Sequence, residues 1–328
     1  MKQLKLKLYR SKEKVKRKIE QLRYGKCSVL LYHRVCLLDN DPQLLAVSPV
    51  NFEEHLNILK QEYHLLSVDA FEQLIGTGGR FPDRSVLITF DDGYVDNYTE
   101  ALPLLEKKAA QALFYICTGN IGNTNEFWWD KAERVLLNNS SEPDKAIQLD
   151  IEGTTYSLRT NEEYRIFYNS ILPVLRKMKV EKRDAVLEHI AVLRNRTVSR
   201  ESHRSMSLTE LKEFSASPAV CIGAHTQNHP SLAALNYSEQ MKEIAESKEF
   251  LEEKLNKQIK HFSYPFGNHE DFNPLSEKVC RELNFSFVAA NIPGVVTAKT
   301  KPFSFPRFIV RNWEPDEFRK QLSNFFEG

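Results

Sequence analysis

From Ser28 onward, short apolar runs alternate along the chain with segments in which apolar residues recur at helical spacing. The apolar runs predict buried strands at 28–33, 86–90, 112–117, 219–223, 261–265, 285–290 and 305–310. The amphipathic segments predict helices at 51–61, near 97–109, near 238–257 and at 315–326. Such alternation is typical of parallel strands joined by helical crossovers. About seven parallel strands favour an α/β fold of the distorted (β/α) barrel type over an open doubly wound sheet.

One stretch, residues 121–205, interrupts this alternation between the third and fourth predicted strands. It is highly charged and contains two amphipathic helical patterns, EEYRIFYNSILPVLRKMK and EKRDAVLEHIAVLRN. A stretch of this length with its own helical pattern is too structured for a linker. We therefore predict a separate segment at 1–26, a β/α barrel domain at 27–328, and a helical insertion in the barrel at about 121–205.

The segment 1–26 holds eleven Lys or Arg against two Glu, although the net charge of the whole chain is only +1. The remaining chain is therefore acidic, and we do not expect its folded body to bind nucleic acid. Apolar residues recur at helical spacing within the segment, at Leu4, Leu8, Val15, Ile19 and Leu22. This pattern predicts a basic amphipathic helix, which either contacts a membrane surface peripherally or packs its narrow apolar stripe on the body or a partner.

The compartment is indicated by what the sequence lacks. Lys and Arg recur throughout the first 26 residues, unlike the uninterrupted apolar stretch of a secretion signal, and no run of eighteen apolar residues follows. The five cysteines are scattered without CxxC spacing, and Cys36, Cys117 and Cys221 lie in or beside apolar runs, where reduced core thiols are ordinary. We therefore expect a cytoplasmic protein, peripheral at the inner membrane face if the basic helix binds lipid.

Two adjacent carboxylates, Asp91 and Asp92, follow the apolar run at 86–90 in the sequence TFDDGY. In a parallel β/α barrel, residues directly after a strand lie at the carboxyl-end rim, where active sites are built. Adjacent side chains leave an extended strand in different directions, so one carboxylate can bind a cation while the other acts as a base. An isolated DDG sequence is also typical of a cap on the next helix.

A second strand end carries His225 and His229, in the sequence GAHTQNHP. Pro230 disfavours helical dihedrals at His229, so this HxxxH pair is expected on a loop. Two imidazoles and one carboxylate form a first shell that suits catalytic Zn²⁺, and Co²⁺ or Fe²⁺ as well. HxxxH alone occurs often by chance, but its combination with a strand-end pair of aspartates is a much stronger signal.

Two further strand ends carry side chains suited to a reaction. In HFSYPFG, Tyr264 and Phe266 offer ring faces to a sugar, and the tight turn can present a backbone N–H to an oxyanion; a structural turn with core aromatics is the alternative. His33, in LLYHRV, ends the first predicted strand. It is either structural or the proton donor to a departing amine.

The sequences TFDDGY, GAHTQNHP and YPFG, in this order, resemble the motifs of the polysaccharide deacetylase family, also called the NodB-homology family or carbohydrate esterase family four. The resemblance covers about residues 28–310, with the stretch 121–205 as an insertion. The opening LLYHRV is similar to the subgroup whose chain begins with a YH-containing strand. Three separate strand ends match in order, which makes the combination specific.

The resemblance implies a role for each matching residue. Asp91 matches the catalytic base. Asp92, His225 and His229 match the ligands of one divalent metal ion, with Zn²⁺ as the first expectation. The backbone N–H of Phe266 matches the donor to the oxyanion.

The sequence departs from the family pattern in two places. Where many members have Arg-x-Pro-Tyr, this chain has Ser-Tyr-Pro-Phe at 263–266, so the Arg that orients the base is missing there; Arg307, in FPRFIV, is a candidate replacement. No His follows His269, so the family's late Leu-x-His motif is also absent. The role of general acid is therefore expected at His33, which resembles the acid of the YH subgroup.

Two adjacent tryptophans, Trp128 and Trp129, begin the insertion. They are costly to expose, so they either pack the insertion on the barrel or line a cleft, and Trp129 is the better candidate for the cleft. Together with Tyr264, Phe266 and Arg307, Trp129 is predicted to lie on the substrate side of the site.

The function implied is that of a metal-dependent hydrolase that removes an N-acetyl group from a sugar or polysaccharide, with an N-acetylated glycan or glycan precursor as its partner. Two alternatives remain open: a deacylase of a nucleotide-linked or lipid-linked sugar, and a metal-binding scaffold that has lost catalysis. The presence of Asp91 beside a full ligand set argues against the scaffold, because an inactive site has no use for a base.

Overall fold

The computed structural model describes residues 20–137 and 146–327. Most of the predicted basic segment, residues 1–26, lies outside the described residues, so the amphipathic helix there stays a prediction. Within the two described ranges, no helix combines the length and the hydropathy of a membrane span.

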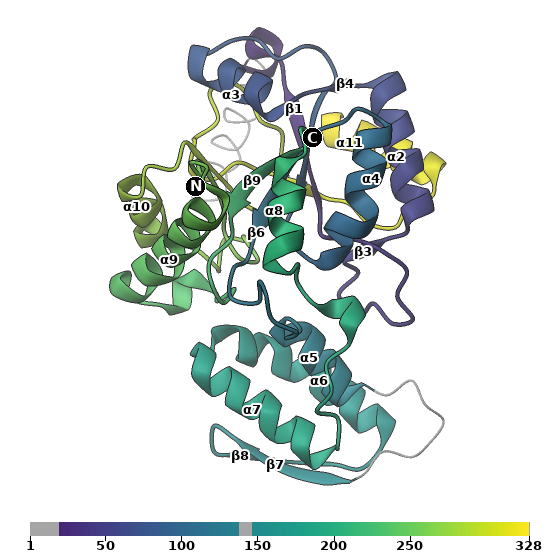
Figure 1. The fold of residues 1–328 in the computed structure, drawn as a ribbon, viewed down its shortest axis with the longest axis vertical. Coiled ribbons are helices and arrows are strands. Elements are labelled where there is room, and N and C mark those ends of the chain that lie inside the picture. Colours follow the sequence, from purple (N-terminus) through teal and green to yellow (C-terminus); the bar gives the residue numbers. More distant parts are fainter. Residues whose placement is uncertain (1–19, 138–145, 328) are drawn as a thin grey trace, which may run out of the picture.

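A parallel sheet surrounded by helices forms the body of the protein (Figure 1). Its strands are β1 (Cys27–Tyr32), β4 (His64–Leu65), β5 (Ser85–Phe90), β6 (Ala112–Ile116), β9 (Val220–Ala224), β10 (His261–Ser263), β11 (Phe287–Ala289) and β12 (Phe308–Ile309). Seven of them follow the order β11-β10-β9-β6-β5-β1-β12, and β4 pairs with β5. The predicted distorted β/α barrel is confirmed, although β10, β11 and β12 are shorter than the apolar runs that predicted them.

The chain segment 302–309 links the two edges of this curled sheet. The amides of Val288 and Ala290, in and after β11, donate hydrogen bonds to carbonyls of the segment. A few residues farther along, the same segment pairs with β1 as strand β12. One strip of chain therefore joins both edges, and Arg307 lies on it.

Helices cover the outer face of the sheet. They are α2 (Pro49–Glu62), the π-helical turn η1 (Asn97–Ala101) with α4 (Leu102–Lys107), α8 (Leu208–Ala216), the short turn η3 (Leu232–Ala234), α9 (Tyr237–Leu255), α10 (Pro274–Glu282) and α11 (Pro315–Glu327), whereas α3 (Val68–Thr77) packs against the barrel interior. Several begin where a polar side chain accepts an amide of the first turn, at Ser48, Ser67, Ser207, Asn236 and Asn273. The sequence predicted α2, α4, α9 and α11, but the shorter α3, α8 and α10 were not predicted.

Alternate residues of each strand face two different hydrophobic cores. One set, which includes Leu30 and Ile88, packs between the sheet and the covering helices. The other set, which includes Val29 and Leu87, fills the interior of the barrel together with Phe71 of α3. Both cores are continuous along the strands, so the strand ends are held in fixed positions.

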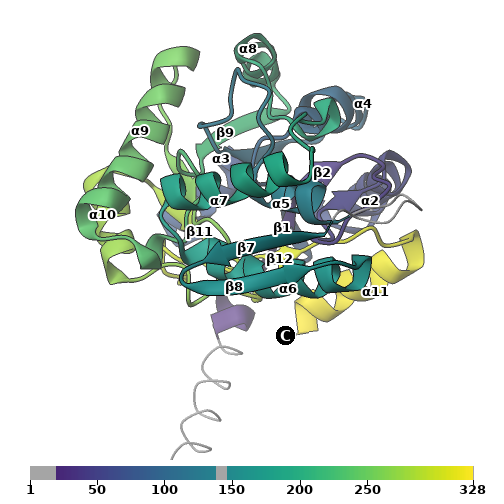
Figure 2. The ribbon, with the colours of Figure 1, turned by 90° about the horizontal axis from the view of Figure 1, so that it is seen from below.

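The insertion forms a separate layer at one end of the barrel (Figures 1 and 2). Its elements are α5 (Trp128–Leu136), β7 (Ile147–Ile151), β8 (Thr154–Leu158), α6 (Asn161–Lys177), α7 (Val180–Leu193) and the short turn η2 (Glu201–His203). Its apolar side chains make a hydrophobic core of their own. The two predicted helices correspond to α6 and α7, whereas the antiparallel hairpin β7–β8, with five residues in each strand, was not predicted.

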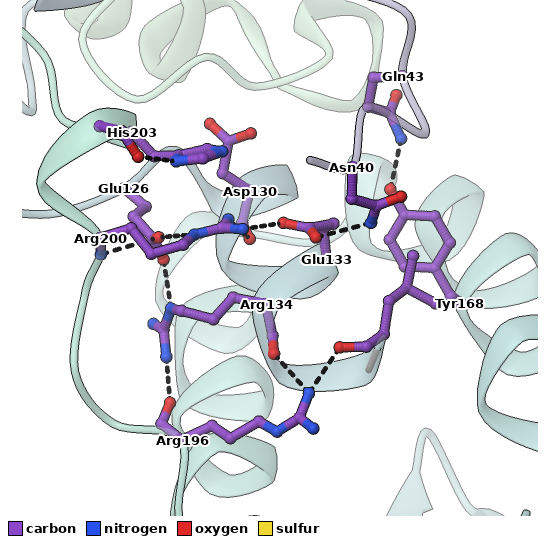
Figure 3. A network of polar contacts seen from close by, with 12 residues as sticks. Asn40, Gln43, Glu126, Asp130, Glu133, Arg134, Tyr168, Arg196, Arg200 and His203 are labelled. Atoms are coloured by element: carbon purple, nitrogen blue, oxygen red, sulfur yellow. Dashed lines mark hydrogen bonds and ion pairs between the residues drawn. The ribbon is translucent and has the colours of Figure 1, made fainter. Parts of the chain in front are cut away.

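Ion pairs tie the beginning and the end of the insertion together (Figure 3). Glu126 lies before α5, and its carboxylate accepts from Arg134 Nε at 2.5 Å and from Arg200 Nε at 2.7 Å. Arg200 lies on the return path to the barrel and also pairs with Glu133 of α5. Because these partners are buried or half-buried, the entry and exit of the insertion are held as one unit.

The loop before β3 (Ala46–Val47), which pairs with β2 (Arg34–Val35), is tied to the insertion as well (Figure 3). Asn40 donates from its side-chain amide to Glu133 at 2.8 Å, and Gln43 donates to the Tyr168 hydroxyl at 2.7 Å. The loop and the insertion are therefore neighbours in one wall of the structure.

Candidate functional site

A cavity of about 470 Å³ lies between the carboxyl ends of the barrel strands and the insertion. The barrel contributes the side chains that were predicted to carry the chemistry: His33, Asp91, Asp92, His225 and His229. The insertion contributes aromatic and polar side chains, among them Trp128, Trp129, Asn169 and Arg176. The strand-end residues of three distant stretches of sequence are thus brought together in one place.

Leu87 of β5 faces the interior of the barrel, and Asp91, four residues later, lies on the same side of the strand direction. Its two carboxylate oxygens accept hydrogen bonds from the two terminal nitrogens of Arg307, both at 2.7 Å. The Ser263 hydroxyl donates to the same carboxylate at 3.2 Å. Burial alone would raise the pKa of Asp91, but the charge and hydrogen bonds of Arg307 outweigh it and lower the pKa below its usual value. Asp91 is therefore an ionised carboxylate at neutral pH.

Arg307 is fully buried, and all five of its N–H groups have acceptors. Besides its two bonds to Asp91, it donates to the Ala290 carbonyl at 3.1 Å, to the Thr89 hydroxyl at 3.2 Å and to the Ser263 hydroxyl at 2.7 Å. The sequence offered Arg307 both as the group that orients the base and as a substrate-side residue. The structure places it behind Asp91, and it is not among the residues that line the cavity.

Asp92, His225 and His229 meet at one point of the cavity wall. Oδ1 of Asp92 lies 3.6 Å from Nε2 of His225 and 3.4 Å from Nε2 of His229. The three ligand atoms all lie within 4.8 Å of one another. Ligand atoms about 2.1 Å from a tetrahedral ion lie about 3.4 Å apart, so the trio has the spacing of a metal first shell.

The lone pairs of the trio also suit a cation. Nδ1 of His225 donates to the Ser263 carbonyl at 2.7 Å, so its Nε2 presents a lone pair toward Asp92. Oδ1 of Asp92 is buried and has no hydrogen-bond partner in the described structure. Burial, and then the charge of Asp91, raises the pKa of Asp92 well above its usual range, while burial lowers the pKa of His225 and that of His229. Lone pairs that converge on a buried, unpartnered oxygen fit a divalent ion between them.

The backbone around this point is strained. Asp92, Thr226, His229 and Phe266 all have left-handed conformations, with φ of 78°, 64°, 51° and 58°. Each such residue costs about 1–3 kcal/mol, and a β-branched residue like Thr226 is rare there. Strain of this kind persists only where the surrounding contacts enforce it, so these positions are held for the geometry of the site.

Hydrogen bonds from outside the site enforce the loop between the two histidines. The Thr226 hydroxyl accepts the His229 amide at 3.1 Å. Glu243, on α9, accepts the amides of Gln227 and Asn228 at 3.1 and 2.9 Å and the Asn228 side chain at 2.8 Å. Glu243 thus fixes the loop that carries His229 although it does not line the cavity.

Phe266 covers one side of the metal-ligand trio. Its ring meets the edge of the His229 ring at 4.5 Å between centroids, and the Arg176 guanidinium lies 3.9 Å above it. The ring lines the cavity, in the tight turn whose backbone was predicted to face an oxyanion. Phe266 therefore lies where a substrate would touch it.

Tyr264 lies elsewhere. Its hydroxyl donates to the Phe303 carbonyl at 3.1 Å, and its ring stacks on Phe272 at 4.2 Å. Because Ser263 faces Asp91, the next residue along the strand faces the opposite side, where the helices pack. The structure thus places Tyr264 in the hydrophobic core and not among the residues that line the cavity.

His33 lies just past β1, is half-buried and lines the cavity. Its carbonyl accepts from the side chain of Asn97 at 2.9 Å, which holds the backbone, while its Nδ1 has no partner in the described structure. Burial lowers the pKa of His33 to about 4; the charge of Asp91 opposes this, and the charges of Arg307 and Arg311 add to it. The neutral ring carries one N–H beside the base.

Trp129 both packs and lines the cavity, so neither of the two alternatives excludes the other. Its ring contacts His229 at 4.6 Å between centroids. Its indole N–H donates to the Tyr94 hydroxyl at 2.8 Å, and Tyr94 in turn donates to Asp130 at 2.6 Å. This chain of hydrogen bonds fixes Trp129 over the metal-ligand trio.

Several residues of the site were missed from the sequence. Ser263 shares the inward-facing side of β10 with His261 and could have been found by that alternation. Glu243, Arg176 and Arg311 belong to charged stretches in which no local pattern distinguishes one residue from its neighbours.

Known proteins resemble this chain over the part that contains Asp91, Asp92, His225 and His229. The family profile described as "Polysaccharide deacetylase" matches residues 78–154 and 154–288, more than half of the chain. A curated relative from Bacillus subtilis (strain 168), YxkH, carries the name of the same family and is 26% identical over 140 residues, which are 42% of this chain and 49% of the relative. The match thus spans about half the length of that relative.

Two solved structures share the fold over most of their length. The Streptococcus pyogenes deacetylase PplD, solved in complex with acetate, superposes with a TM-score of 0.59 at 18% identity, over 90% of this chain and 98% of that one. IcaB from Ammonifex degensii gives a TM-score of 0.59 at 20% identity, over 92% of this chain and 97% of that one. At these identities the likeness shows a shared fold and nothing about substrate.

Proposed function

The chain belongs to the polysaccharide deacetylase family, and on this basis we propose that it hydrolyses the N-acetyl group of a sugar with the help of one divalent cation. The observation that carries the proposal is the meeting, in one cavity, of an ionised base, Asp91, with the trio Asp92, His225 and His229. Hydrolysis of an amide by water needs both a base for the water and a positive centre for the carbonyl oxygen.

Each residue of the site has one task in the proposed reaction. When bound, the divalent ion supplies a Lewis acid that polarises the acetamide and acidifies water. Asp91, held ionised by Arg307, takes a proton from the water that attacks the carbonyl carbon. The backbone N–H of Phe266 donates to the carbonyl oxygen as it gains negative charge. His33, whose ring is neutral before the reaction, relays the proton that Asp91 took to the departing nitrogen, and acetate and a free amino sugar result.

We propose Zn²⁺ as the cation, because two imidazoles and a carboxylate form a common first shell of catalytic zinc; Co²⁺ and Fe²⁺ suit the same set. The substrate class is an N-acetylated glycan or a precursor of one. The cytoplasmic location stays a prediction. If the protein is cytoplasmic, a glycan precursor fits better than a finished cell-wall polymer. A nucleotide-linked or lipid-linked sugar remains the alternative inside the same chemistry.

The test is acetate release from N-acetylglucosamine oligomers by the full-length protein, stripped with a chelator and reloaded with Zn²⁺, Co²⁺ or Fe²⁺. Release is expected only after reloading. Asp91→Asn is expected to lower kcat by about 10²- to 10⁴-fold, the range for removal of a general base. Its metal content should stay at one ion per chain, because Asp91 is not one of the trio. Asp83→Asn, at an exposed carboxylate, is the matched control.

Two results would contradict the proposal. Asp91→Asn with unchanged turnover would mean that the base lies elsewhere. Bound metal without acetate release from any N-acylated sugar would favour the metal-binding scaffold.

A further inference from the structure

Arg311 is a cation at the cavity whose charge is not used by the reaction described above. It lies two residues beyond Ile309 of β12, so the two side chains point to the same side of the strand. Both residues line the cavity. Nη1 of Arg311 donates to the carbonyl of Gln43 at 3.3 Å and to that of Leu44. Both acceptors are uncharged, so the positive charge of Arg311 is held in place without being neutralised.

The other two arginines at the site differ in this respect. Arg307 is paired with Asp91, and Arg176 forms a two-point contact with Asp271. In the part of the chain that the structure describes, no carboxylate lies within ion-pair distance of Arg311. The carboxylate whose charge it feels is that of Asp41, which already accepts two backbone amides at 2.9 Å.

Once the site holds its cation, the net charge of the cavity is therefore positive. Arg307 neutralises Asp91, Arg176 is neutralised by Asp271, and the trio offers one carboxylate to an ion of charge two. Arg311 adds a further positive charge in the same cavity. A cavity of one sign attracts ligands of the opposite sign and raises their local concentration.

Uncharged hydrogen-bonding groups line the same cavity. Asn169 and Asn291 line it, and the side-chain amide of neither forms a hydrogen bond to another described residue. Amides of this kind recognise hydroxyl groups, because they both donate and accept. The wall that surrounds Arg311 thus suits a polyhydroxylated ligand with one anionic substituent.

We propose that the substrate is an N-acetylated sugar that carries an oxyanion, either a carboxylate or a phosphate, and that Arg311 binds this group. The planar guanidinium matches either oxyanion through two parallel hydrogen bonds. This inference rests on the proposed function and names the substrate class within it. Because Arg311 is held against the carbonyls of Gln43 and Leu44, the oxyanion binds beside this loop.

The test compares three substrates with the zinc-loaded protein: an N-acetylhexosamine, its counterpart with a carboxylate at carbon six, and its phosphate ester. We expect kcat/KM to be at least 10-fold higher for one of the two anionic sugars than for the neutral one, and the preference to weaken as salt rises. The sugar that is preferred shows whether the oxyanion is a carboxylate or a phosphate. Arg311→Gln should reduce the preference at least 10-fold, and Arg311→Lys should restore part of it. Arg319→Gln, at an exposed arginine of α11, should leave the preference as it is.

Binding supplies a readout that does not depend on turnover. Titration of the zinc-loaded Asp91→Asn protein with the same sugars should show at least 10-fold tighter binding of the anionic sugar, and addition of Arg311→Gln should abolish the difference. Equal kcat/KM and equal affinity for neutral and anionic sugars would overturn the inference but leave the deacetylase function standing. An equal loss on all substrates in Arg311→Gln, unrelieved by Arg311→Lys, would also overturn it, since it would assign Arg311 to holding the loop at Gln43. Absence of acetate release from all three sugars would refute the proposed function itself.

Discussion

The barrel wall of the cavity and the insertion wall hold their side chains in different ways. On the barrel wall, strained backbone positions such as Asp92 and His229 are fixed by hydrogen bonds, and Arg307 uses every donor it has. The insertion wall consists of helices with a hydrophobic core of their own, and it contacts the barrel through rings such as Trp129 on His229 and through polar links such as that of Arg176. The groups proposed for the reaction are thus held mainly by hydrogen bonds and ion pairs, whereas the insertion wall is held mainly by ring packing.

The contrast predicts that damage to the barrel wall costs more than damage to the insertion wall. Arg307→Gln should have the largest effect, because it leaves Asp91 buried without its counter-charge. We expect a loss of about 3–5 kcal/mol in the free energy of unfolding, as for other buried pairs that lose one partner. Turnover should fall by about 100-fold, since the base is no longer aligned. Denaturant titration and acetate release measure the two effects.

Arg307→Lys separates charge from geometry at this position. It keeps a cation beside Asp91 but not the two-point contact, so it should recover stability more fully than turnover. Wild-type turnover in Arg307→Gln would refute the role of Arg307 in aligning the base.

A smaller effect is expected at Glu243, which fixes the histidine loop from outside the cavity. Glu243→Ala removes the acceptor of two backbone amides and should weaken Zn²⁺ binding by about 10- to 100-fold, as is usual for partners that orient metal ligands. Competition with a zinc chelator measures the affinity. Glu243→Gln keeps one oxygen acceptor, so its Zn²⁺ affinity should lie between that of the wild type and that of Glu243→Ala. An unchanged affinity in Glu243→Ala would mean that the left-handed loop is stable by itself.

The smallest effect is expected at Tyr94, a barrel residue that holds Trp129 and Asp130 of the insertion wall. Tyr94→Phe leaves the indole N–H of Trp129 and the buried carboxylate of Asp130 without their shared partner, which should cost about 1–3 kcal/mol of stability. Because Trp129 contacts a metal ligand only through its ring, acetate release should fall less than about 10-fold. Tyr168→Phe is a control, because its partner Gln43 is half-exposed and can turn to water. A drop in turnover as large as that of Arg307→Gln would erase the contrast between the walls.

The fold could be predicted because its main elements have a period. Strands of five or six apolar residues alternate with amphipathic helices, and parallel strands that alternate with helices close into few arrangements. Elements of two or three residues, such as β2, β3 and β4, carry no period and depend on tertiary contacts. The hairpin β7–β8 was missed for a related reason: five alternating residues within a charged stretch do not outweigh the helical pattern around them.

The site could be predicted as far as strand ends determine it. Asp91, Asp92, His225 and His229 follow strands, and the carboxyl ends of parallel strands gather at one rim. Tyr264 shows the limit, since a displacement of one residue along a strand moves a side chain from the cavity to the core.

Side chains that reach the site from outside a strand end follow no such rule. Glu243 and Arg176 extend from helices, and their partners lie far away in the sequence. Only the folded chain shows which of many charged residues comes near the cavity.

The strip at 302–309 has a consequence for the order in which the molecule matures. A growing chain acquires all three metal ligands once His229 has emerged from the ribosome, well before residue 307 is made. Such a nascent chain contains Asp91 and the trio, yet Asp91 still lacks the guanidinium that pairs with it in the finished fold. The proposed hydrolysis therefore depends on the same late segment that joins the two sheet edges, so it begins only in a chain whose barrel is complete.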